Sequence, residues 1–396
     1  MTWELAVNLL SAGVAFLLGN LLHRGQDWIR QRRSMKHLTR IQEQRHPRFT
    51  HDWLVRYYLD KGRLDDLYLF EDNGHRNLVP FLTRPSWAIT DIAEEELIQQ
   101  DVPQFRSTVN VDQRVLRRRV NYLPGVRRDG AVWNDLLACA AGVGDGPKGP
   151  RIRLIMAEYF QFLSACGSLE DETYDAIRGR NRRTPLRDKF MPDLKTAELC
   201  PLGAHAFGMQ AAFVFDDDGV FKILIQRRSN SVSIYGGALA VVPVFGCQSF
   251  DLTDESSVSV YHNFLREVYE ELYGGVEVER PGPRVDPRWF YVEPSVARLI
   301  EAREAGEFEF KLLGFGFDAL NGEIDISGLA LVTKNHFACD ELARMTANWE
   351  IQNIQVWDLF GARLTAALLT NEFSPGSVYT IARAREVVRA RKEGQS

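Results

Sequence analysis

Two long strand-turn-strand patterns in the second half of the chain constrain its fold most strongly. The stretch "AFGMQAAFVFDDDGVFKILIQRRS" joins two apolar runs through Asp218-Gly219, a dipeptide typical of tight hairpin turns. The stretch "FEFKLLGFGFDALNGEIDISGLALVTK" repeats the pattern around Asn321-Gly322. Between them, "GGALAVVPVFG" has the composition of one or two further strands, and residues 258–273 have helical spacing. Hairpins mixed with helices predict an α+β fold over residues 200–390, with a mixed β-sheet flanked by helices.

The helix predicted at residues 258–273 carries three glutamates close together. Glu267, Glu270 and Glu271 fall within an arc of about 100°, because each helical residue turns by about 100°. Carboxylates four positions apart on a helix repel each other by a few tenths of a kcal/mol. Either water and salt screen these charges on an exposed face, or a cation lies between them. The other side of the helix carries an apolar stripe made of Tyr261, Phe264, Leu265, Val268 and Leu272.

The composition is that of a folded globular protein. A chain of 396 residues is too long for one ordinary core, and its apolar and charged fractions are 45% and 26%. The net charge of −5 gives no overall attraction to nucleic acid, so we do not expect nucleic acid as a partner. The five cysteines are scattered and odd in number, which indicates reduced thiols rather than a disulfide framework or a zinc site.

The N-terminal segment predicts a membrane anchor. Residues 5–22, "LAVNLLSAGVAFLLGNLL", form an uncharged run of 18 residues, which is just long enough to cross the core of a bilayer. Residues 24–50 follow as a basic juxtamembrane segment, so the positive-inside rule places everything after about residue 23 in the cytoplasm. We therefore expect a single-pass membrane protein, with residues 1–23 as its transmembrane helix. A buried or interfacial helix is the alternative, because Asn8, Ser11 and Asn20 lower the hydropathy.

Residues 51–195 are predicted to form a mostly helical region. The stretches "AVWNDLLACAAG" and "IRLIMAEYFQFLSACG" have the character of buried helices, each ending at a glycine. The stretch "GVGDGPKGP" between them is expected to be a loop, and Pro147 excludes a phosphate-binding P-loop there. Strand-like sequence patterns begin near residue 200, so we expect a separate domain over residues 196–396.

The stretch from Arg266 to Glu271, R-E-V-Y-E-E, resembles the R-E-U-x-E-E core of the Nudix box, where U is an aliphatic residue. The order of strands around it is also similar to that of Nudix hydrolases, and the resemblance covers roughly residues 200–390. The chain departs from the motif at three positions. Val258 and Leu252 stand where the motif has glutamate and glycine, and Tyr273 stands where it has a second glycine. Glu255 is the loop carboxylate that lies nearest to the missing glutamate.

The resemblance implies a Nudix-like fold and roles for particular residues. Box glutamates in that family bind Mg²⁺ or Mn²⁺, and the metal assists water in cleaving a diphosphate linkage, which agrees with the preference of hard cations for carboxylate oxygens. Carried over, the catalytic metal ligands are Glu267, Glu270 and Glu271, with Glu255 as a further ligand. Arg266 orients these carboxylates. Arg227 and Arg228, at the end of a strand, hold phosphate.

Three functions follow from these patterns. The first is a membrane-anchored Nudix-like hydrolase that cleaves a nucleoside diphosphate linked to another group with a divalent metal. The second is a catalytically inactive Nudix-like module that binds a nucleotide. The third is a membrane-tethered interaction protein without a small ligand. The presence of Glu255 or another carboxylate beside the metal distinguishes the first function from the second.

Overall fold

The computed structural model describes residues 46–394 apart from a set of gaps, and all described residues lie in one compact unit, Arg45–Ser396. The gaps are residues 90–91, 101–106, 117–133, 135, 180–182, 231, 233, 250–257, 276–285, 334–340 and 349. No helix among the described residues has the length and apolar character needed to span a membrane. The predicted anchor, residues 1–23, lies outside the described residues, and so does Glu255.

The strands form one large mixed sheet in which the main order is β1-β2-β10-β11-β6-β4-β5-β3. β12 and β8 join this sheet through β7, and β9 joins it through β6. The strands are β1 (Leu67–Asp72), β2 (His75–Leu82), β3 (Ile98–Gln99), β4 (Leu136–Gly146), β5 (Gly149–Glu158), β6 (His205–Asp217), β7 (Val220–Arg228), β8 (Leu239–Val241), β9 (Val244–Gly246), β10 (Phe308–Asp318), β11 (Ile324–Val332) and β12 (Ile351–Asp358).

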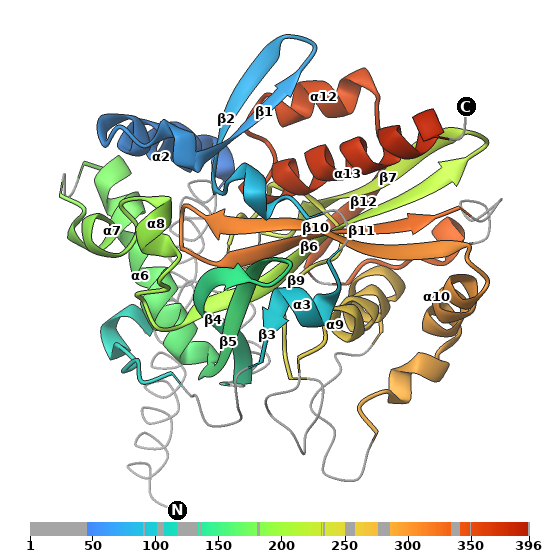
Figure 1. Cartoon of the computed structure of the whole chain (residues 1–396), viewed down its shortest axis with the longest axis horizontal. Coiled ribbons are helices and arrows are strands. Elements are labelled where there is room, and N and C mark those ends of the chain that lie inside the picture. Colours follow the sequence, from blue (N-terminus) through green and yellow to red (C-terminus); the bar gives the residue numbers. More distant parts are fainter. Residues whose placement is uncertain are drawn as a thin grey trace, which may run out of the picture. The chain divides into compact units, whose positions relative to one another are not determined.

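Helices cover both faces of the sheet (Figure 1). The α-helices are α2 (Pro47–Asp60), α3 (Glu94–Leu97), α6 (Tyr159–Ile177), α7 (Pro185–Phe190), α8 (Leu194–Ala197), α9 (Val260–Glu267), α10 (Pro294–Glu304), α12 (Ala362–Leu368) and α13 (Pro375–Gly394). A π-helical turn, Val268–Leu272, continues α9. Short 3₁₀ turns span Leu64–Asp66, Pro85–Trp87, Trp289–Val292 and Leu342–Arg344.

β6 is the central strand. It runs parallel to β11 on one side, and on its other side it pairs antiparallel with β4 at its start, β9 in its middle and β7 at its end. Its alternate side chains enter two different cores, because successive residues of a strand point to opposite faces. Phe213 and its odd-numbered neighbours pack in the core that holds α9 and α10, whereas Val214 packs in the core that holds α12 and α13.

The predicted hairpins are confirmed. β6 and β7 meet at Asp218-Gly219, where the φ angles are 52° and 83°, as a two-residue turn with both central residues in the left-handed region requires. β10 and β11 meet around Asn321-Gly322, and the predicted strands of "GGALAVVPVFG" are β8 and β9. The α+β class with a mixed sheet flanked by helices is therefore correct for residues 200–390.

The prediction that residues 51–195 are mostly helical was wrong. "AVWNDLLACAAG" ends in the first part of β4. "IRLIMAEYFQFLSACG" is the end of β5 followed by the first half of α6, which begins at a capping box between Glu158 and Gln161. The cause is burial of both faces of β4: Ala138 packs in one core and Cys139 in another. Such a strand is a continuous apolar run without alternation, and the run is indistinguishable from a buried helix in sequence. Through β4 and β6 the sheet continues across residue 196.

Candidate functional site

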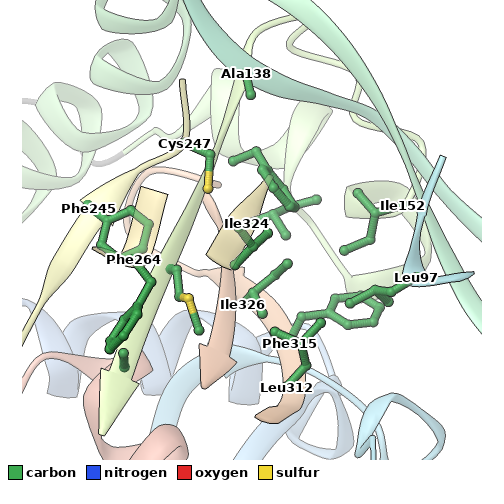
Figure 2. Packing of buried hydrophobic residues seen from close by; sticks show 14 of the residues in the cluster. Leu97, Ala138, Ile152, Phe245, Cys247, Phe264, Leu312, Phe315, Ile324 and Ile326 are labelled. Atoms are coloured by element: carbon green, nitrogen blue, oxygen red, sulfur yellow. The ribbon is translucent and has the colours of Figure 1, made fainter. Parts of the chain in front are cut away.

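The segment with the three glutamates begins as a regular α-helix. The carboxylate of Glu94 accepts the backbone N–H groups of Val260 and Tyr261 at 2.6 and 3.3 Å, and the Ser259 side chain accepts that of His262. Four side chains of the predicted apolar stripe, Phe264, Leu265, Val268 and Leu272, have no exposed surface. Figure 2 shows Phe264 in the cluster that also contains Phe245, Ile324 and Ile326. This part of the sequence prediction is confirmed.

The helix changes its geometry where the glutamates occur. Val268–Leu272 is a π-turn, in which the backbone bonds to the fifth rather than the fourth residue along the chain. Glu267 precedes this turn, while Glu270 and Glu271 lie inside it. The regular 100° spacing assumed from the sequence therefore does not hold here. Glu270 is 7% exposed and Glu271 only 1%, so these carboxylates do not lie on a solvated helix face.

Arg266 pairs with two of the three glutamates. Its Nη2 atom lies 2.5 Å from Oε1 of Glu267, and its Nη1 atom lies 3.7 Å from Oε1 of Glu270. Nη2 also donates to the Asn263 side chain at 3.3 Å. The guanidinium is itself buried, and a buried pair holds its geometry because separation leaves an uncompensated charge. Arg266 thus has the orienting position that the Nudix resemblance implies.

Glu271 is the most deeply buried carboxylate of the group. Burial raises the pKa of its carboxyl well above the usual range, and the negative charges of Glu267 and Glu350 add to this effect. The Arg228 charge and a hydrogen bond from the backbone N–H of Val244 lower the pKa. Within the described part of the chain, its Oε2 atom has no hydrogen-bond partner. A buried oxygen without a partner costs free energy, so this atom suggests a ligand that the protein alone does not supply.

The two arginines at the end of β7 have different surroundings. We call α9 and its π-turn the box helix. Arg228 follows Leu224 and Gln226 on the face of β7 that is turned toward the box helix, and its charge acts on both Glu271 and Glu350. Arg227 continues the opposite face, and its Nη1 atom donates to the carbonyl of Gly237 at 2.8 Å. The structure therefore brings Arg228, but not Arg227, to the glutamates.

Glu350 is a fourth carboxylate at this place, and sequence reasoning missed it. It lies just before β12, whose residue Ile351 pairs with Arg228. Burial raises the pKa of Glu350, as does the charge of Glu270, whereas Arg228 and Arg266 lower it. The residue precedes a recognisable strand, but no local pattern says which strand β12 will pair with. Glu350 comes close to the box helix because β12 pairs with β7.

Val258 is a described residue of the loop half of the motif, and it is buried. Val258, which stands where the Nudix motif has a glutamate, is 2% exposed. Its backbone N–H donates to Oε1 of Gln100 at 3.0 Å, and its carbonyl accepts from Nε2 of the same side chain. This position is therefore fixed to the segment after β3 and supplies no carboxylate.

The donor chemistry of the site fits a hard divalent cation. Glu267, Glu270, Glu271 and Glu350 offer carboxylate oxygens, which Mg²⁺ and Mn²⁺ prefer, and the orphaned Oε2 of Glu271 is such a donor. In the conformation seen across the described residues, no group of three or more His, Cys, Asp and Glu side chains is arranged to hold a metal ion.

Neither protein-family models nor curated proteins match the sequence. Solved structures that are similar to this chain include Nudix domains. The Nudix domain of *Shewanella oneidensis* NrtR, complexed with ADP ribose, is 16% identical over 47% of this chain and 89% of its own, with a TM-score of 0.28. A *C. elegans* Ap4A hydrolase is 12% identical over 47% of this chain and 98% of its own, with a TM-score of 0.25.

A third similar structure is a bifunctional NMN adenylyltransferase/ADP ribose pyrophosphatase from *Francisella tularensis*, complexed with AMP and a Mn ion. It is 11% identical over 55% of this chain and 53% of its own, with a TM-score of 0.31. The TM-scores of these structures lie below 0.5, so the proposals below rest on the residues of the site.

Proposed function

We propose that this protein binds a nucleoside diphosphate linked to another group at the box helix and hydrolyses the diphosphate with Mg²⁺ or Mn²⁺. The observation that carries the proposal is the buried cluster of box carboxylates, in which Oε2 of Glu271 has no hydrogen-bond partner among the described residues. Glu267, Glu270 and Glu271 are the proposed metal ligands. Glu255 remains a proposed ligand from the sequence alone.

Each side chain of the site has a separate task in this proposal. A divalent cation, when bound, supplies positive charge beside the diphosphate. Arg266 holds the carboxylates of Glu267 and Glu270 in place through its ion pairs. Arg228 contacts a phosphate oxygen, for which its half-buried guanidinium on the glutamate side of β7 is suited. Arg227, on the opposite face of β7, donates to the Gly237 carbonyl, and its role in holding phosphate stays a prediction from the sequence.

Hydrolysis is tested by release of phosphate from linked diphosphates. ADP ribose and Ap4A have no terminal phosphate monoester, whereas their cleavage products do, so a phosphatase added afterwards releases phosphate only after cleavage. We expect metal-dependent release by the wild type and none by Glu270→Gln. Glu304→Gln, at the exposed end of α10, is the matched control and should keep the activity. Absence of release from a broad set of linked nucleotides with both metals contradicts the hydrolase proposal.

A binding module without hydrolysis is the second candidate. Two observations favour it: Val258 replaces the loop glutamate, and Arg266 already neutralises part of the charge of Glu267 and Glu270. In that case the same nucleotides should raise the melting temperature without phosphate release, and Arg228→Met should reduce the increase. Release of phosphate by the wild type excludes this candidate.

We also propose that residues 1–23 anchor the chain in a membrane with the bulk of the protein in the cytoplasm. The support is the uncharged run of 18 residues followed by the basic segment 24–50. Full-length protein should sediment with membranes, and removal of residues 1–23 should make it soluble. Recovery of the full-length protein in the soluble fraction after mild lysis contradicts the anchor.

A further inference from the structure

β12 lies at an edge of the sheet. Among the described residues it pairs with β7 and with no other strand. Residues 352–357 make no further backbone hydrogen bond to a described segment. In a strand with a single neighbour, the N–H and C=O groups of every second residue point away from the sheet. Such a row of unpaired groups can accept another strand.

The strands at the ends of the main strand order are protected against such pairing, whereas β12 is not. β3 has only two residues, and β1 has six, of which Glu71 and Asp72 are charged. Proteins commonly prevent edge pairing with short strands, charged residues or proline. β12 has eight residues, I-Q-N-I-Q-V-W-D, with no proline and with its only charge at the last position. Its composition therefore favours pairing with a further strand.

Exposed apolar side chains gather at the same edge. Val356 of β12 is 42% exposed. Phe360, just after β12, and Val220, at the start of β7, are also exposed. Asp358 pairs with Lys222 in the ladder, so Phe360 and Val220 both lie just beyond this pair. Neighbouring apolar side chains exposed on a surface mark a contact site.

The charge pattern of β12 favours a second copy of the chain as its partner. Residues 351–357 are uncharged, so they offer no ion pair to an acidic or basic peptide. Amide side chains such as Gln352 and Asn353 both donate and accept hydrogen bonds, which suits pairing of the strand with itself. In an antiparallel pair on a two-fold axis at mid-strand, the two Asp358 carboxylates lie at opposite ends, about 23 Å apart. Each also keeps its ion pair with Lys222.

We propose that β12 pairs antiparallel with β12 of a second copy of this chain, so that the sheet continues across a two-fold dimer. The dimer covers the unpaired backbone edge and the exposed Val356 together. The inference goes beyond the proposed function and does not depend on it, because it uses none of the box carboxylates.

The experiment measures the mass of the full chain by sedimentation equilibrium in density-matched mild detergent. It compares the wild type with Val356→Lys and Leu69→Lys. Leu69 is the matched control, because it is 43% exposed and lies on β1, at another edge of the sheet. The wild type and Leu69→Lys should be dimers. Val356→Lys should raise the dissociation constant of the dimer by at least about 10-fold, because both lysines come close to the two-fold axis and repel each other.

Hydrogen exchange of residues 351–358 locates the contact on the strand. In the wild-type dimer the outward N–H groups of β12 are bonded to the second copy, so they should exchange slowly. In Val356→Lys they should exchange faster, while β1 should exchange as in the wild type. Should Val356→Lys not fold, Gln352→Lys takes its place, since Gln352 is an exposed residue of the same strand.

Three results overturn the inference. A wild type that stays monomeric up to near-millimolar concentration forms no such dimer. A dimer that persists in Val356→Lys, with unchanged exchange in β12, associates through another surface. Dissociation caused by Leu69→Lys instead assigns the contact to β1. None of these results bears on hydrolysis or on metal binding, so the proposed function is tested separately.

Discussion

Replacement of Glu271 by glutamine should change how stability depends on pH. In the folded protein, burial holds the pKa of this carboxyl well above its usual range, and the charges of Glu267 and Glu350 act in the same direction. Unfolding exposes the carboxyl and returns its pKa to about 4.3. Between these two values the folded state keeps a proton that the unfolded state has released. The stabilisation is therefore complete at low pH and is lost as the pH rises through the folded-state pKa.

The size of the effect follows from the single proton involved. The contribution of Glu271 to the free energy of unfolding should fall by about 1.4 kcal/mol for each pH unit within this window. Glutamine has nearly the same shape as glutamate, keeps an oxygen for the Val244 N–H and does not titrate there. Glu271→Gln should therefore become progressively more stable than the wild type as the pH is raised from 5 to 7.

Urea denaturation in the presence of a metal chelator measures this difference. The two proteins are compared at pH 5, 6 and 7, and Glu304→Gln serves as an exposed control that should follow the wild type. A stability difference that stays constant across this range refutes the reasoning, because it means that Glu271 titrates as an exposed carboxyl does. Such a result also removes the buried cluster on which the proposed function depends.

Three further tests concern buried positions of the fold. Leu265→Ala should lower the free energy of unfolding by about 2 to 5 kcal/mol in urea denaturation, since Leu265 has no exposed surface; a loss below about 1 kcal/mol contradicts its place in the core. Gly314→Ala should destabilise far more than Gly219→Ala. Both glycines have positive φ angles, but a Cβ at Gly314 lies 2.4 Å from the Tyr379 hydroxyl, whereas one at Gly219 meets nothing within 4 Å; equal losses contradict the close approach. Burial lowers the pKa of His205 to about 4 from 6.5, so the contribution of this ring to stability should fall by about 3 kcal/mol on acidification from pH 6.5 to 4. An NMR titration should find the ring neutral above pH 5, and a ring that is charged at pH 6 contradicts its burial.

The sequence predicted best those features of the fold that neighbouring residues determine. The turn at Asp218-Gly219 and the apolar stripe of Phe264, Leu265, Val268 and Leu272 were predictable because a dipeptide or a helical period specifies them. β4 was not predictable as a strand, since burial on both faces removes the alternation that marks strands. Its pairing with β6, far along the chain, is what makes it a strand.

The candidate site was predictable only in part for the same reason. Glu267, Glu270, Glu271 and Arg266 stand in one short motif and could be found together. The π-turn that contains Glu270 and Glu271 has no sequence signature, so their burial was not foreseen. Likewise, the separation of Arg227 from Arg228 depends on which face of β7 meets the box helix, and the approach of Glu350 depends on the pairing of β12 with β7.

The melting temperature in the presence of Mn²⁺ tests the central claim most directly. A ligand that binds only the folded state stabilises it by about 2.7 kcal/mol at 100 times its dissociation constant, which corresponds to an increase of several degrees in the melting temperature. We predict this increase for the wild type and for Glu304→Gln, and none for the protein with Glu270→Gln and Glu271→Gln combined. In chelator, the double variant should melt close to the wild type, because Arg266 keeps its ion pair with Glu267 and the change removes no packing. No response of the wild type to millimolar Mn²⁺, with or without ADP ribose, or an equal response of the double variant, contradicts the claim that these buried carboxylates bind a metal.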